Sequence, residues 1–520
     1  GTAITTLSGA NTYTGVTTVT GGTLRLAGGS ALVDSGAVVV TAPGILDVAA
    51  AETIGDLTGT GSVTLSGGAL SLGSGNFTGV ISGANGLTKV GSGSFTLAGA
   101  NTFSGPLTVN NGTVVLAGGA AVADTTAVVV NAASGPPATS GTLQVSAAET
   151  IGSLAGSGGS VVLGAALTTG GDNSSTSYAG VISGTGSLTK EGTGTFTLTG
   201  ANTYSGGTVV NAGTLSGAAG PLQGAFLVNA AGTLQFAQPT DASFGGALSG
   251  AGTVVKAGAG VLTLTGTNTG HTGTLAINGG AVSIASASNV GTGVIALTGS
   301  TLTTTGALTL ANAVTLNTPG GTINTGAATT LSGVISGAGS LTKAGTATLT
   351  LTGANTYTGG TIISAGTVAG AVGPIQGNFV INTDATLRFD QPVDGTFAGS
   401  ILGTGTVQKE GAGVLTLSGT NSAHTGVTSI NGGAVSIAAA SNIGTGAVNF
   451  NGGSLITTGP LTLANAIGLG AGGGTFVAQS NTNLSGIISG TGGFTSSGPA
   501  VLTLSGANTY TGVTTVTGGT

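Results

Sequence analysis

Residues 351–359 read LTGANTYTG, and close copies of this stretch return along the whole chain. The asparagine of the stretch recurs at Asn11, Asn101, Asn202, Asn268, Asn355, Asn421 and Asn508. A spacing of 153 residues separates Asn202 from Asn355 and Asn355 from Asn508. Self-similarity at a fixed period indicates a repeat architecture, in which each unit buries its apolar face against its neighbours.

A second motif precedes the first, because residues 333–337 read GVISG and residues 341–343 read LTK. The motif starts again at Gly79, Gly180, Gly246, Gly399 and Gly486. The lysines that follow it share one repeat position: Lys89, Lys190, Lys256, Lys343 and Lys409. Ser496 replaces lysine in the sixth copy, so five of the seven basic residues occupy one corner of the repeat.

A shorter period of about 20–22 residues lies inside the long one, and its segments alternate apolar and polar residues. Residues 348–352 read TLTLT, which places both leucines on one face of a strand and the threonines on the other. A unit of this length without a helix predicts an all-β fold, a parallel β-helix of roughly 22–24 coils. We expect residues 1–520 to form one continuous solenoid. Leucines at strand centres should point inward: Leu262, Leu264, Leu349, Leu351, Leu415 and Leu417.

Composition excludes several classes of protein. Gly accounts for 106 of 520 residues, and Asp, Glu, Lys and Arg together for 4%. Seven basic residues are too few to coat a nucleic acid. The absence of cysteine excludes disulfides and thiolate metal sites. Every apolar run is far too short for a transmembrane helix, and we predict no cofactor.

Residues 351–361 together with 365–367 resemble the autotransporter-associated β-strand repeat. The resemblance extends to residues 7–24, 97–116, 198–215 and 502–520, and more loosely to 264–282 and 417–435. It implies a right-handed parallel β-helix in the passenger region of a Gram-negative autotransporter. It also implies export across the outer membrane to the cell surface, often with a role in adhesion or biofilm.

The candidate site residues all favour a structural role. His271 and His424 are 153 residues apart at one repeat position, which predicts polar corner residues rather than a shared metal site. Tyr13, Phe103, Tyr204, Tyr357 and Tyr510 also share a position. Because Phe replaces Tyr there, packing is favoured over carbohydrate stacking.

The charged residues predict no catalytic site. The cluster Asp384, Arg388, Asp390 and Asp394 lacks a nearby histidine and reads as a surface ion pair. The repeated lysines are expected at a solvated corner, too far apart for a basic stripe.

The function expected is therefore structural: an extracellular stalk, adhesin segment or fibre at the cell surface or in biofilm, without catalysis. Two alternatives stay open. One is a polysaccharide-binding module that uses a Thr/Ser/Asn-rich face, and the other is a β-helix glycosidase or lyase.

Residues 503–520 are identical to residues 6–23. This identity predicts one 497-residue unit plus an overlap, taken from a longer array. The end coils are then expected to be open and to stack on further copies of the solenoid, covalently or end to end.

Overall fold

The computed structural model describes residues 3–133 and 139–519. Within them lie 58 short strands and two one-turn 3₁₀ helices, η1 (Ala287–Asn289) and η2 (Ala440–Asn442). The all-β prediction is confirmed. The chain divides into two compact units. The first holds the described residues up to Gly258 together with Thr265–Gly273, and the second holds Ala259–Leu264 together with the described residues from Thr274 onward.

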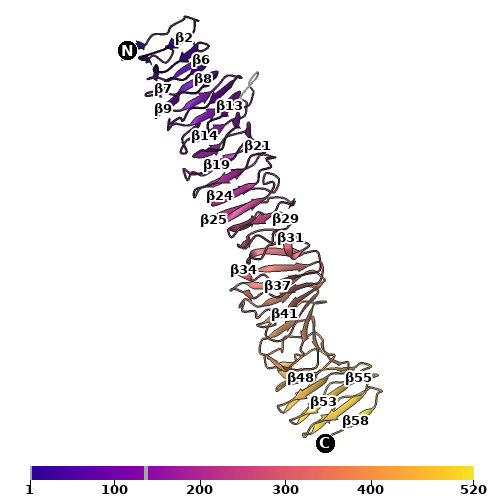
Figure 1. Cartoon of the computed structure of the whole chain (residues 1–520). Helices are drawn as coiled ribbons and strands as arrows, with labels where there is room; N and C mark the ends of the chain where they lie inside the picture. The colour runs from indigo at the N-terminus through magenta and orange to yellow at the C-terminus, as the bar shows by residue number, and fades with distance from the viewer. Residues whose placement is uncertain (1–2, 134–138, 520) are drawn as a thin grey trace. The chain divides into compact units, whose positions relative to one another are not determined.

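The first unit is built from parallel sheets in which each strand pairs with a strand of the next coil. One sheet has the order β1 (Ile4–Leu7), β3 (Thr23–Leu26), β5 (Ile45–Val48), β7 (Ser62–Leu65), β9 (Val80–Gly83). Other parallel runs of this unit contain β10 (Leu87–Lys89), β12 (Leu107–Val109), β14 (Ala127–Val130), β22 (Leu188–Lys190), β24 (Thr208–Gly217), β25 (Phe226–Ala237) and β28 (Thr253–Ala257). Figure 1 shows these strands stacked one above another.

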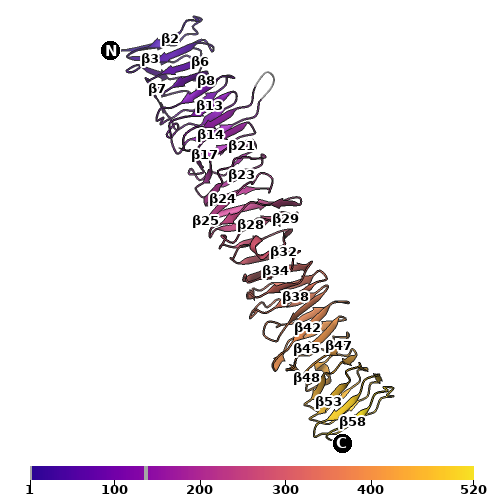
Figure 2. The ribbon, with the colours of Figure 1, turned by 45° about the vertical axis from the view of Figure 1, so that its right-hand side comes forward.

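The second unit repeats this arrangement. Its ten-stranded sheet runs β33 (Leu308–Leu310), β35 (Thr329–Leu331), β38 (Thr348–Leu351), β40 (Thr367–Gly370), β42 (Thr386–Asp390), β45 (Thr406–Glu410), β47 (Thr428–Ile430), β49 (Val448–Phe450), β52 (Ile467–Leu469), β55 (Ile488–Gly490). A second sheet runs β43 (Gly395–Phe397), β46 (Val414–Leu417), β48 (Ala434–Ile437), β50 (Ser454–Thr457), β53 (Gly474–Ala478), β56 (Phe494–Ser497), β58 (Thr514–Val516). Figures 1 and 2 show β53 and β58 in the same C-terminal part of the stack, and β56 pairs with both of them.

The register of the ladders gives the length of each coil. Leu87 lies beside Leu107 and Leu107 beside Val128, so these coils have the length that the short period predicts. Other coils depart from the predicted length in both directions. Thr208 lies beside Phe226, which makes a shorter coil, and Thr113 beside Thr142, which makes a much longer one. The segments between the strands absorb this variation, so the strands keep their pairing.

The interior is a set of apolar rows. Leu349 and Leu351 of β38 are fully buried while Thr350 between them is not, which confirms the predicted alternation. The other four predicted leucines are buried in the same way: Leu262, Leu264, Leu415 and Leu417. Aromatic rings join these rows, as where Phe397 lies with its ring centroid 5.2 Å from that of Phe389. In strands β1 and β58 the side chains of Ile4 and Val516 are exposed.

Close approach between coils explains the motif glycines. Gly337, the last residue of GVISG, has φ +109°, and a Cβ there would lie 2.2 Å from the carbonyl oxygen of Leu316. Gly353 of LTGANTYTG lies over Gly333 of the preceding coil, and its Cβ would lie 2.2 Å from the Gly333 oxygen. Neither position has room for a side chain, and only glycine adopts the first conformation readily.

Candidate functional site: a repeated buried corner

The motif asparagine connects three successive coils. Asn355 is buried, and its Oδ1 accepts a hydrogen bond from the Ile335 amide of the coil before, at 2.8 Å. Its Nδ2 donates to the Pro374 carbonyl of the coil after, also at 2.8 Å. The Oδ1 of five other copies accepts from the preceding coil at 2.7–3.0 Å: Asn101, Asn202, Asn268, Asn421 and Asn508. Asn11 donates to the following coil, at Ala31. These residues are the coil-bridging asparagines.

The repeated lysines are buried, so the predicted solvated corner is wrong. Lys343 has no exposed surface, and its Nζ donates to the carbonyl oxygens of Ala344 at 2.8 Å, Gly345 at 2.7 Å and Ala365 at 3.0 Å. Similar carbonyl groups surround the other four Nζ atoms: those of Lys89, Lys190, Lys256 and Lys409. We call each such arrangement a carbonyl cradle.

Strand alternation accounts for the burial of lysine. In the LTK segment Leu341 is buried, Thr342 faces outward and Lys343 is buried again. Lys343 stands in register with Ile323 of one neighbouring coil and Ile363 of the other, so its aliphatic stem continues an apolar row. Its ammonium group then reaches the carbonyl groups at the turn that follows the strand. The same alternation that placed the leucines inward therefore also places the lysine inward.

Burial lowers the pKa of the buried lysines, and neighbouring carboxylates oppose this shift at some of them. It lowers the pKa of Lys89 and of Lys343 to about 8, since removal from water disfavours the ammonium form. The pKa of Lys190 and of Lys409 is also lowered by burial, but the charges of Glu191 and Glu410 oppose that shift. Carbonyl oxygens favour the charged form as well, which is why these cations are tolerated inside.

The aromatic position packs at the corner, as predicted. Tyr357 is buried, and its hydroxyl lies 2.5 Å from Thr361 Oγ1. Tyr204 has the same environment with Thr208, and Phe103 fills the position without a hydroxyl. Tyr13 and Tyr510 keep the hydroxyl contact, to Thr17 and Thr514, but are more exposed.

His271 and His424 lie at the corresponding corner and are buried more deeply than expected. Nε2 of His424 is hydrogen-bonded to the Gly405 carbonyl at 3.0 Å, and Nε2 of His271 to that of Gly252 at 3.1 Å. Burial lowers the pKa of both imidazoles, although these hydrogen bonds act in the opposite direction. Each histidine therefore stabilises a corner of its own unit through a hydrogen bond to the preceding coil.

Two buried glutamates were missed by the sequence reasoning. Both carboxylate oxygens of Glu149 accept from backbone amides, those of Ala121 at 3.0 Å and Val122 at 3.1 Å. Glu52 binds the amides of Ala31 and Leu32 in the same way. The signal was available, because residues 51–55 and 148–152 both read AETIG.

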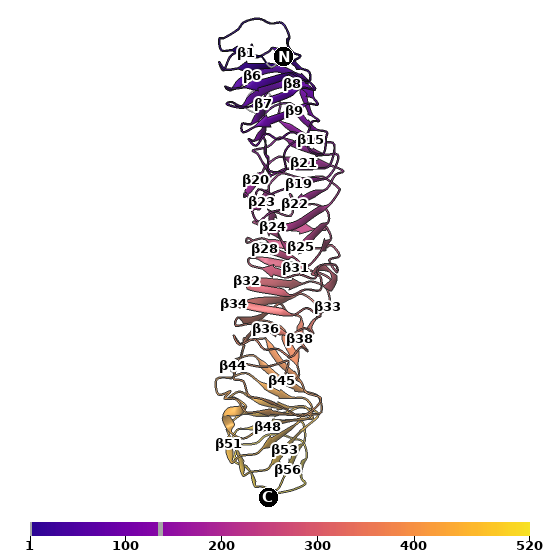
Figure 3. The same cartoon turned by 60° about the vertical axis from the view of Figure 1, so that its left-hand side comes forward.

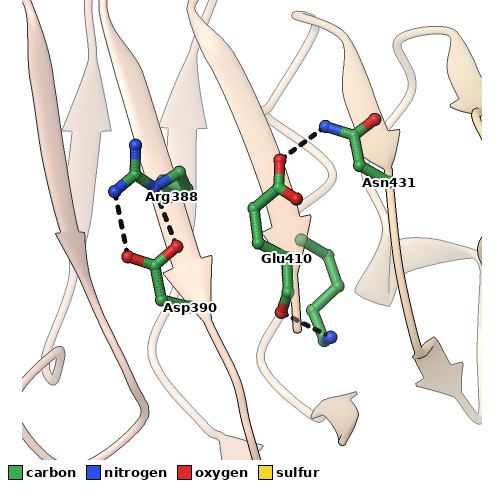
Figure 4. A network of polar contacts seen from close by, with 5 residues as sticks. Arg388, Asp390, Glu410 and Asn431 are labelled. Carbon is green, nitrogen blue, oxygen red and sulfur yellow. Dashed lines mark hydrogen bonds and ion pairs between the residues drawn. The ribbon is translucent and has the colours of Figure 1, made fainter. Parts of the chain in front are cut away.

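Of the predicted charged cluster, only Arg388 and Asp390 form an ion pair. Arg388 donates to both carboxylate oxygens of Asp390, at 2.8 and 3.0 Å, on the outer side of β42 (Figure 4). On the next strand Glu410 accepts from Asn431 at 2.7 Å. Asp394 accepts from the Val414 amide, and Asp384 lies in a turn with φ +65°. Neither belongs to the pair.

In residues 3–133 and 139–519, no group of three or more His, Cys, Asp or Glu side chains could hold a metal ion. None of the helices in that part of the chain has the length and apolar character needed to cross a bilayer.

Seven segments match the family described as passenger-associated-transport-repeat: residues 1–26, 87–116, 188–216, 254–284, 341–369, 407–437 and 494–520. Each contains one coil-bridging asparagine, and five of them also contain a buried lysine. The family repeat thus coincides with the buried corner. No curated protein and no solved structure matches the chain.

Proposed function

This chain is a parallel β-solenoid repeat protein of the autotransporter passenger type, and from that premise we propose that it serves as an exported structural segment. It would form part of a stalk or fibre at the surface of a Gram-negative cell, without catalysis. Adhesion would be a property of particular surface sites, not of the repeated corner.

The proposal rests on the hydrogen bonds that the buried polar side chains make to backbone groups. All five lysines and both AETIG glutamates bind backbone groups, and each coil-bridging asparagine bonds the backbone of a neighbouring coil. These side chains hold successive coils in register, and a buried polar group left without its partner is costly. Such an arrangement supports an extended scaffold.

Surface shaving of intact cells tests the export. The full-length gene product is expressed in its Gram-negative host, and intact cells are treated with an external protease. We expect peptides of residues 3–519 to be released, while a cytoplasmic marker protein stays uncut. Peptides that appear only after lysis would contradict export.

A cleavage assay tests the absence of catalysis. The purified chain is incubated with neutral and acidic polysaccharides, and new reducing ends are measured. We expect none above the rate of the heat-denatured chain. Cleavage that disappears in Asp390→Ala or Asp394→Ala would show that the outer carboxylates are catalytic.

A further inference from the structure

A groove crosses the outer face of a three-stranded sheet in the second unit. The sheet consists of β51 (Leu461–Leu463), β54 (Thr482–Leu484) and β57 (Leu502–Leu504). A hollow of about 580 Å³ lies on it, lined among others by Thr462, Asn483 and Thr503. A second hollow, of about 320 Å³, lies beside it and also has Thr462 in its wall. We call them together the β51 groove.

The helix η2 borders this groove. Ala440 and Ser441 of η2 line the smaller hollow, and η2 contacts β51. In Figure 3 a short helical turn stands out beside β51. The one-turn helix thus raises a wall at one side of an otherwise flat strand face. The groove is open to solvent, which fits a chain lying on the surface better than an enclosed small molecule.

The polar groups that line the groove are all uncharged and stand among apolar side chains. Hydroxyl groups come from Ser441, Thr445, Thr462 and Thr503, and carboxamides from Asn465, Asn481 and Asn483. No residue after Glu410 carries a formal charge. Hydroxyls and carboxamides both donate and accept hydrogen bonds, so they match a ligand that presents many neutral hydroxyl groups. An ionic ligand would find no counter-charge there.

Strand register sets polar groups in a row across the coils. Thr462 stands beside Asn483, and Asn483 beside Thr503. Neighbouring strands lie about 4.8 Å apart, so one polar side chain is offered at each step of about that length. Ser505 Oγ donates to Asn483 Oδ1 at 2.8 Å and thereby orients the amide of Asn483. This spacing is comparable to the length of one sugar ring.

The internal copy 153 residues earlier lacks two of the three carboxamides, although Asn312 stands where Asn465 lies. Ala328 and Thr330 stand where Asn481 and Asn483 lie, and Ala307 stands where Pro460 lies. The threonines at positions 309 and 350 correspond to Thr462 and Thr503. The coil itself therefore does not require Asn481 or Asn483, and the earlier copy supplies a matched control surface.

We propose that the β51 groove binds a neutral polysaccharide strand, laid across β51, β54 and β57. The carboxamide of Asn483 and the hydroxyl of Thr462 hold sugar hydroxyls, and small side chains such as Pro460 and Val501 contact the ring faces. Each of these hydrogen bonds replaces one to water, so a single groove binds weakly, with a dissociation constant on the order of 1 mM. This inference does not rest on the proposed structural function and goes beyond it.

Affinity electrophoresis of the folded chain tests the proposal. Native gels contain soluble galactomannan, dextran or mixed-linkage β-glucan as neutral probes, or alginate as an anionic one. We expect retardation by at least one neutral polymer and none by alginate. The double substitution Thr462→Ala with Asn483→Ala should weaken the retardation at least fivefold. The matched pair Thr309→Ala with Thr330→Ala should leave it unchanged.

Three results would overturn the proposal: no retardation by any of the neutral polymers, equal retardation of both double variants, or a preference for alginate. Thermal unfolding of each variant accompanies the gels. Both pairs lie on outer faces, so their melting temperatures should match that of the parent chain. If the groove variant instead unfolds early, the single substitution Asn483→Thr replaces it, because threonine is the residue that the earlier copy has there. It must still weaken the retardation.

Discussion

Lys343 and Lys409 occupy the same repeat position and differ in the residue that follows. Both are fully buried, and the Nζ of each donates to three backbone carbonyls. Ala344 follows the first, and Glu410, whose carboxylate reaches outward to Asn431, follows the second. Burial takes the pKa of Lys343 to about 8, whereas the charge of Glu410 opposes the shift at Lys409. The carbonyl cradle therefore suffices to hold a buried cation, and the carboxylate outside only adjusts the pKa of the lysine.

We expect the largest loss of stability when a charge is buried without a carbonyl cradle around it. Leu351→Asp places a carboxylate in the row that holds Leu331, with no acceptor or donor arranged for it. We expect a loss of about 3–5 kcal/mol in the free energy of unfolding, measured by urea denaturation. Thr350→Asp, on the outward side of the same strand, should cost less than about 1 kcal/mol. Equal costs would show that the inward register of β38 is wrong.

Substitution of a coil-bridging asparagine should cause the second-largest loss in the free energy of unfolding. Asn355→Ala leaves the Ile335 amide and the Pro374 carbonyl without their partner. Each buried orphan group costs about 1–3 kcal/mol, so we expect a loss of about 2–4 kcal/mol in urea denaturation. Asn378→Ala is the control, because Asn378 makes its hydrogen bond to Ser400 at an exposed site. A similar loss in both variants would show that the motif asparagine contributes no more to stability than an exposed asparagine does.

The pH dependence of stability should separate the two lysines. The folded pKa of Lys343 is about 8 and its ordinary value is 10.5, so between these limits the unfolded chain binds more protons. The free energy of unfolding therefore rises with pH in this window. Lys343→Met should reduce the rise between about pH 7.5 and 9.5, and Lys409→Met should reduce it less.

The window stops at about pH 9.5 because buried tyrosines act in the opposite direction near pH 10. Burial raises the pKa of Tyr357, so its titration destabilises the fold only as the unfolded chain loses that proton. An equal reduction in both lysine variants would show that Glu410 does not tune its neighbour.

A buried hydroxyl without a partner gives the smallest effect. Tyr178 is fully buried, and its hydroxyl oxygen has no hydrogen-bond partner among the described residues. Phe77 fills the same repeat position in another copy. Tyr178→Phe should therefore stabilise the chain by about 1 kcal/mol, seen as a higher urea midpoint. A lower midpoint would mean that the hydroxyl is satisfied.

Much of the fold could be predicted because the solenoid repeats a two-residue alternation within a coil-length period. Leu349 and Leu351 obey that alternation, and the motif glycines mark the turns. The burial of Lys343 follows from the same rule, yet a charged side chain reads as solvated until its acceptors are known. Those acceptors are backbone carbonyls of its own turn and of the next coil, and no residue type encodes them.

The partners of other polar residues also depend on three-dimensional register. Glu149 binds amides of Ala121 and Val122, which lie in the preceding coil. The long coil between Thr113 and Thr142 sets that pairing, and sequence spacing alone predicted shorter coils. The ion pair of Arg388 and Asp390 could be found more easily, because both lie on one strand two positions apart.

Amine labelling of the native chain tests the central claim most directly. The chain has five lysines, and all of them lie in carbonyl cradles: Lys89, Lys190, Lys256, Lys343 and Lys409. Reductive methylation, read by mass spectrometry peptide by peptide, compares the folded chain with the chain in denaturant. We expect all five lysines to be modified in denaturant and to stay at least tenfold less modified when folded. Methylation of Lys343 in the folded chain at the denatured rate would contradict the buried cation.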